Sequence, residues 1–83
     1  MTDIDKLLEE RGKILGDAET THCMAMELFT ITISGSSKIS KVGQAMLFLI
    51  MVKIARGVEN PTHADHWRDI QGYARLIEKV ECQ

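Results

Sequence analysis

The sequence predicts an all-α protein, a small four-helix bundle whose third helix is central and buried. Four segments carry apolar residues at helical spacing, and glycine, serine or Asn-Pro separates them. The one stretch with strand-like alternation, Thr30–Ile33, has no second strand to pair with. Because the chain has 83 residues, we expect a single domain spanning residues 1–83.

The first helix is expected to be short. Thr2 and Asp5 have the spacing of a capping box, with Asp in place of Glu, and apolar residues follow at helical spacing. Gly12 and Gly16 interrupt that pattern. Asp17 is placed to cap a second helix over residues 18–30.

A connector rich in serine and glycine, residues 34–38, precedes the third and fourth helices. Ser40 is the expected cap of the third helix, over residues 41–56, and Gly57 is its expected end. Asn60-Pro61 follows, and the Thr62/Asp65 pair predicts the start of a fourth helix over residues 63–80.

The third helix is apolar on nearly all sides, because residues 45–52 form an unbroken apolar run. Three short neighbours in one chain would hardly cover it, so we expect a homo-oligomer in which a second copy supplies the missing cover. Eight residues are far fewer than the roughly 20 that span a bilayer, which argues against a membrane protein.

Composition limits the partners and the compartment. A formal net charge of −2 lacks the basic excess that nucleic-acid binding needs. Cys23 and Cys82 form no CxxC pair, and the N-terminus has no signal-peptide pattern. We therefore expect a cytoplasmic protein with free thiols, and we regard nucleic acid as an improbable main partner.

Polar chemistry concentrates in HADHWRDIQGY, residues 63–73. On a helical wheel of the fourth helix Asp65 and Asp69 share an edge. Lys53 and Arg56 stand at the end of the third helix, and because only a short loop separates the two helices, their charged groups can approach the first turn of the fourth. The predicted core face consists of Trp67, Ile70, Ala74 and Ile77, with His66, Tyr73 and Val80 along its margin.

Two interpretations of these charges remain open. Arg56 can form a salt bridge with Asp65 or Asp69 that joins the two helices. Alternatively, Lys53, Arg56 and His63 bind phosphate oxygens at the N-terminus of the fourth helix, and the carboxylates hold Mg²⁺ or orient the cations.

The segments ERGKILGDAE, KIARG and NPTHADHWRDIQGYARL, in that order, resemble a family of small bacteriophage-encoded helical domains of poorly defined function. The resemblance covers residues 8–76. Such domains are distantly similar to the all-α nucleoside triphosphate pyrophosphohydrolases and to a segment of the nucleotide kinase of some lytic phages. The resemblance implies a phage origin, a helical fold that oligomerises and a link to nucleotides.

Carried over by position, the motif falls on Arg11, Lys13, Gly16, Asp17, Glu19, Lys53, Arg56, His63, Asp65, Trp67, Asp69, Gly72 and Tyr73. Leu15 and Gln71 depart from the residues usual in the family. The EExxE motif of the pyrophosphohydrolases is incomplete, because Lys13 stands where the third carboxylate should be, and no later ExxD is present. Hydrolysis by that magnesium mechanism is therefore not implied.

The leading hypothesis is a phage protein that binds a nucleotide or nucleotide-derived phosphate ligand in the cytoplasm of the infected bacterial host. Lys53 and Arg56 would contact phosphates, and Tyr73 would face the base or ribose. The predicted ligand-binding residues are Lys13, Asp17, Glu19, Lys53, Arg56, His63, Asp65, Asp69 and Tyr73. One alternative is a magnesium-dependent nucleotide phosphohydrolase or transferase, and another is a small interaction protein that inhibits a host factor.

Overall fold

The computed structural model contains four α-helices and describes residues 3–15, 18–34 and 38–83, with the backbone alone for residues 11–15. The helices are α1 (Asp3–Leu15), α2 (Ala18–Ile33), α3 (Lys41–Glu59) and α4 (Ala64–Glu81). No strand occurs in these residues, so the all-α prediction is confirmed. Within the same ranges, none of the helices has the length and apolar character needed to cross a membrane.

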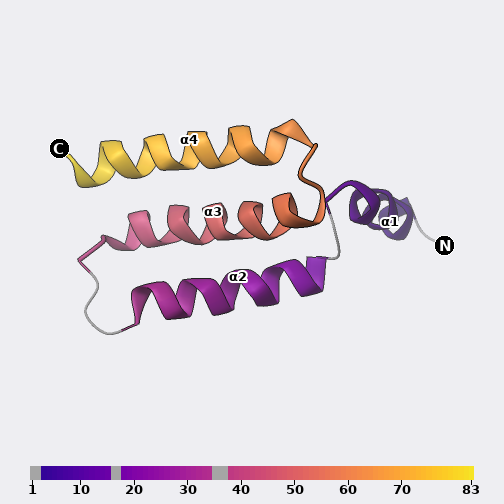
Figure 1. Ribbon diagram of the computed structural model, residues 1–83, viewed down its shortest axis with the longest axis horizontal. Coiled ribbons are helices and arrows are strands. Elements are labelled where there is room, and N and C mark those ends of the chain that lie inside the picture. Colours follow the sequence, from indigo (N-terminus) through magenta and orange to yellow (C-terminus); the bar gives the residue numbers. More distant parts are fainter. Residues whose placement is uncertain (1–2, 16–17, 35–37) are drawn as a thin grey trace.

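Three of the helices form one layer in which α3 lies between α2 and α4 and runs opposite to both (Figure 1). The contacts of α3 are extensive with α4 and α2 and slight with α1. α1 lies at the end of the layer where α2 begins and α3 leads into α4 (Figure 1). α3 is thus central, as the sequence predicts, but two neighbours in one layer do not bury it: Met51 and Val52 are the buried residues of the apolar run 45–52, and Ala45 is exposed.

The hydrophobic core lies between α2 and α3. Ala25 of α2 is buried against Met51 and Val52 of α3. The rings of Phe29 and Phe48 meet edge to face beside this cluster, with centroids 5.7 Å apart, a geometry that aromatic pairs favour. This small apolar contact fixes α2 on α3.

Two helices continue past the positions where the sequence predicts an end or an interruption. α1 passes through Gly12, because one glycine costs a helix only about 1 kcal/mol. α2 extends to Ile33 rather than ending at Thr30. The hydroxyl of Thr32 donates to the carbonyl oxygen of Leu28 at 2.7 Å. This bond satisfies the hydroxyl group and lets the β-branched threonine be accommodated in the helix.

The N-terminus of α3 is capped as predicted and is also joined to the end of α4. The hydroxyl oxygen of Ser40 accepts a hydrogen bond from the backbone N–H of Gly43 at 3.0 Å. The backbone N–H of Ser40 donates to Glu81 Oε1 at 3.0 Å, and the Ser40 hydroxyl donates to the same oxygen. These bonds join residues 41 positions apart in sequence.

The prediction that Gly57 ends α3 is wrong. Gly57 lies buried inside the helix, which continues to Glu59. A Cβ at Gly57 would stand 2.7 Å from Cη2 of the Trp67 indole. The glycine is therefore needed for the close approach of α4 rather than for a helix terminus. This contact positions the start of α4, where the predicted functional residues gather.

Candidate functional site

The N-terminus of α4 is not capped in the predicted way. The helix begins at Ala64, and the N-cap residue is His63 rather than Thr62, with no hydrogen bond from its side chain to the first turn. Asp65 cannot complete a capping box because its side chain points outward and is 68% exposed. His63 thus supplies no side-chain cap, although the His66 N–H donates to the His63 carbonyl oxygen at 3.2 Å. The N–H groups at a helix N-terminus attract anions.

The face of α4 that meets α3 is displaced by one residue from the predicted one. His66 is 1% exposed, whereas Trp67 is 40% exposed, so the prediction that Trp67 lies in the core is wrong, as it is for the exposed Ala74. The buried or half-buried residues of α4 recur at steps of four and three, as expected for one narrow seam. They include His66, Ile70, Tyr73, Ile77 and Val80.

Trp67 lies at the edge of this seam and covers the end of α3. Its ring packs over Gly57, and its Nε1–H donates to the carbonyl oxygen of Pro61 at 2.8 Å. The indole therefore fixes the loop between α3 and α4 while much of its surface stays in solvent.

One ion pair joins the two helices. Lys53 Nζ of α3 lies 2.9 Å from Asp69 Oδ2 of α4, and the lysine side chain is only 17% exposed. The expected salt bridge between the helices is thus present, but its cation is Lys53 rather than Arg56. Because of this pairing, much of the charge of Lys53 is already neutralised.

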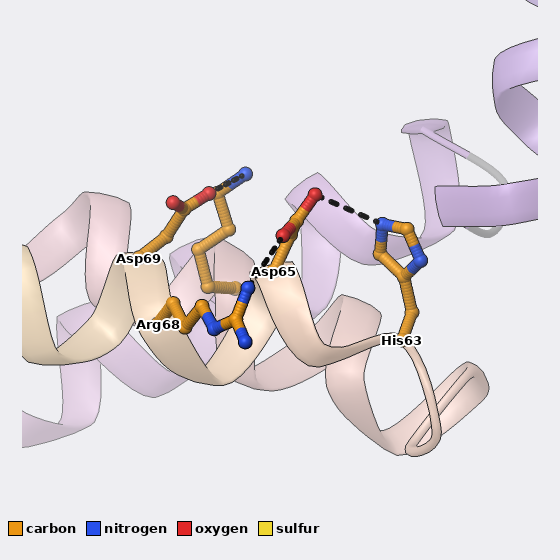
Figure 2. A network of polar contacts seen from close by, with 5 residues as sticks. His63, Asp65, Arg68 and Asp69 are labelled. Atoms are coloured by element: carbon orange, nitrogen blue, oxygen red, sulfur yellow. Dashed lines mark ion pairs between the residues drawn. The ribbon is translucent and has the colours of Figure 1, made fainter.

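Asp65 makes looser contacts on the outer surface, where Figure 2 shows its carboxylate between His63 and Arg68. Its oxygens lie 3.7 Å from His63 Nε2 and 4.0 Å from Arg68 Nη1. Exposed pairs of this kind contribute little to stability, typically below about 1 kcal/mol. Asp65 therefore pairs with His63 and Arg68 and forms no ion pair with Arg56 among the described residues.

Buried polar atoms without partners mark the middle of the junction. Arg56 Nε and both ring nitrogens of His66 have no hydrogen-bond partner in the part of the chain that the structure describes. Over 90% of buried polar groups in folded proteins have one, so three such atoms need an explanation. The ring of His63 stands at the edge of the His66 ring, with centroids 4.8 Å apart.

The electrostatics of His66 show that the charged residues converge on it. Burial lowers the pKa of His66 below its ordinary value of 6.5, and His63, Lys53 and Arg56 lower it further, against a smaller opposing effect of Asp69. The imidazole is therefore neutral at neutral pH, with one N–H donor and one acceptor nitrogen. Beside the permanently charged guanidinium of Arg56, it can donate to an oxygen of an anion.

The predicted ligand-binding residues divide into three groups. Around His66 the structure gathers Lys53, Arg56, His63 and Asp69, with Asp65 on the outer side of the same turn. Tyr73 is half-buried one turn beyond Asp69, and Glu19 is exposed in the first turn of α2 with no ion pair to the junction among the described residues. Asp17 and the side chain of Lys13 lie outside the described residues.

His66 is the residue that the sequence-based list omits. Helical spacing placed it on the margin of the core face, where a histidine is usually a packed residue. The signal that could have identified it is its step of four to Ile70 and then three to Tyr73, which defines the true seam of α4.

The described residues contain no group of three or more His, Cys, Asp or Glu side chains arranged to hold a metal ion. A bound Mg²⁺ would need phosphate oxygens of the ligand as well as a carboxylate such as Asp69. Asp69 is paired with Lys53, so magnesium would compete with that lysine.

Residues 1–81 match the family model described as a domain of unknown function (DUF6378), and the chain belongs to that family. No curated protein and no solved structure matches the chain. A family without an assigned function fits the resemblance drawn from the sequence motifs. The phage origin and the distant similarity to pyrophosphohydrolases stay predictions.

Proposed function

We propose that this protein binds the phosphate group of a nucleotide or nucleotide-derived small molecule at the junction of α3 and α4, as part of the nucleotide handling of a phage. The observation that carries the proposal is the burial of Arg56 Nε and of both His66 ring nitrogens without hydrogen-bond partners. A phosphate oxygen accepts hydrogen bonds from the Nε–H of Arg56 and from the one N–H of the neutral His66 ring, which would remove the cost of two of these three atoms.

The balance of charge at the junction also favours an anion. Lys53 is neutralised by Asp69, and Asp65 faces His63 and Arg68 on the outside. Arg56 is left as the cation of this cluster without an acidic partner among the described residues. The N-terminus of α4, which the His63 side chain does not cap, adds the positive end of a helix dipole on the same side.

The organic part of the ligand has an aromatic surface beside this cluster. Trp67 is 40% exposed, although its Nε1–H is fixed by Pro61. A base stacking on the indole would gain about 1–3 kcal/mol, a size typical of base–aromatic contacts. The net charge of −2 favours a small phosphorylated ligand over the backbone of a nucleic acid.

Isothermal titration calorimetry with cyclic and linear nucleotides, with and without Mg²⁺, tests the proposal. We expect Arg56→Ala to weaken binding at least 10-fold, because a charge-assisted hydrogen bond is worth about 1.5–3 kcal/mol. The variant should keep the helical circular dichroism of the parent, because the Arg56 Nε has no partner to lose.

Arg68→Ala is the matched control, because Arg68 lies on the outer surface of the same region and is 76% exposed. It should bind as tightly as the parent protein. Equal affinities of Arg56→Ala and Arg68→Ala, or a parent protein that binds no nucleotide in the whole panel, would contradict the proposal.

A further inference from the structure

A second feature, distinct from the charged cluster around His66, is the apolar surface that α1 and α2 leave in solvent. On α1, Ile4, Leu7 and Leu8 form a stripe at helical spacing and are 69%, 49% and 62% exposed. A helix of 13 residues is marginal in water by itself, and α1 has only slight contact with α3. The stripe is the face by which α1 would be stabilised.

The outward side of α2 has the complementary character. Met26, Glu27, Thr30 and Ile31 line a shallow hollow of about 350 Å³ on it. Glu19 and Glu27 are the only charged residues of α2, which has no lysine or arginine. An exposed helix with so few charges is unusual for a surface that faces only water.

We propose that two copies of this chain form a two-fold symmetric dimer in which the α1 stripe of each copy lies against the hollow on α2 of the other. Such an interface is self-complementary, because each copy contributes both surfaces once. The hollow offers apolar walls to the leucine side chains, and the same contact stabilises α1.

The available area suits a second copy. The exposed apolar residues of the stripe and the hollow together present on the order of 600 Å² per copy, not far below the roughly 800 Å² per partner of a standard interface. They are Ile4, Leu7, Leu8, Met26 and Ile31.

The extended shape and the small core of one copy also favour a dimer. The radius of gyration is 14.4 Å, against about 12 Å for a compact domain of this length. The buried hydrophobic residues of the described chain are Ala25, Met51, Val52 and Ala55. A chain with so small a core gains more from a partner that is always present, its own copy, than from an occasional one.

Sedimentation equilibrium at about 10 µM tests the dimer, with the concentration chosen to be well above the nanomolar range of stable interfaces. The parent protein should have twice the 9.3 kDa mass of one chain. Leu7→Glu should sediment as a monomer. Leu76→Glu is the matched control, because Leu76 of α4 is 46% exposed and Leu7 is 49% exposed, and it should stay dimeric.

A cross-linking experiment keeps the proposal testable if Leu7→Glu fails to fold. Cys23 is exposed on the hollow side of α2, one turn before Glu27. Protein carrying Cys82→Ser is mixed with protein carrying Leu8→Cys, Cys23→Ser and Cys82→Ser and is oxidised gently. A disulfide-linked heterodimer is expected; its absence, or a parent mass of 9.3 kDa, would overturn the proposal.

Discussion

The two flanks of α3 differ in what each leaves unsatisfied. On the α4 side, polar atoms of Arg56 and His66 are buried without hydrogen-bond partners. On the α2 side, apolar side chains such as Met26 and Ile31 are 50% and 74% exposed to water. The buried polar donors would be satisfied by an acceptor such as a phosphate oxygen. The exposed apolar side chains would be covered by another apolar surface.

The sequence of α3 is apolar on all sides, but the helix makes two different kinds of contact with its neighbours. Toward α2 the helix presents Met51 and Val52, which form an ordinary core. Toward α4 it presents Gly57, Lys53 and Arg56, which permit close approach and place cations beside His66. Changes on one flank should therefore leave the other unaffected, because few residues contribute to both.

The largest effect on stability is expected at Gly57, where the α4 flank is tightest. Gly57→Ala would place a methyl group against Trp67, and overpacking costs about 1–3 kcal/mol against a gain of about 1 kcal/mol in helix propensity. We expect a net loss of about 1–2 kcal/mol in the free energy of unfolding, measured by urea denaturation at fixed protein concentration.

Gly72 of α4 is the matched control, since an added methyl group there meets no atom within 4 Å. Gly72→Ala should stabilise the protein by about 0.5–1 kcal/mol through helix propensity alone. Two alanine variants with the same sign and size would contradict the close packing of Trp67 on α3.

The next effect is a pH dependence of stability caused by His66. Because the folded protein holds the His66 pKa below 6.5, the unfolded chain binds the proton more readily. The stabilising effect of the neutral ring is complete well above pH 6.5 and is lost as the pH falls below it. The slope contributed by one group is at most about 1.4 kcal/mol per pH unit.

Denaturation curves between pH 5 and pH 8 would measure this slope, with the window set by the 6.5 value. In His66→Leu, which cannot titrate, the slope below pH 6.5 should become shallower. His22→Leu is the control, because His22 is exposed on the α2 side, outside the cluster around His66. An unaltered slope in His66→Leu would mean that another group causes the pH dependence.

The fold was predictable because its signals are local. Ser40 caps α3 through its own side chain, and the apolar run of residues 45–52 lies in the helix with two neighbours. The predictions are wrong where a contact with a residue distant in sequence determines the local structure. Gly57 is typical of a helix end in sequence, but the approach of Trp67 gives it a place inside α3.

The location of the candidate site could be predicted from the sequence, but the ion pairs within it could not. The sequence places Lys53, Arg56, His63 and Asp69 at one junction, because a short loop joins their helices. It could not assign Asp69 to Lys53 rather than to Arg56, since that choice depends on side-chain directions across two packed helices. His66 and Trp67 both stand at helical spacing to Ile70, so the sequence allows either to face α3, and the rotation of α4 in the structure selects His66.

The smallest expected effect distinguishes a cationic site from a magnesium site. Asp69→Asn would release Lys53 from its 2.9 Å ion pair and remove a negative charge from the surroundings of Arg56. If the phosphate is bound by cations and the α4 N-terminus, nucleotide affinity without Mg²⁺ should rise a few-fold, which corresponds to less than about 1.4 kcal/mol. Under magnesium-dependent binding or catalysis, the same variant should lose affinity and any phosphate release that requires Mg²⁺. Titration calorimetry and a phosphate-release assay on one preparation separate the two, because the affinity change has opposite signs.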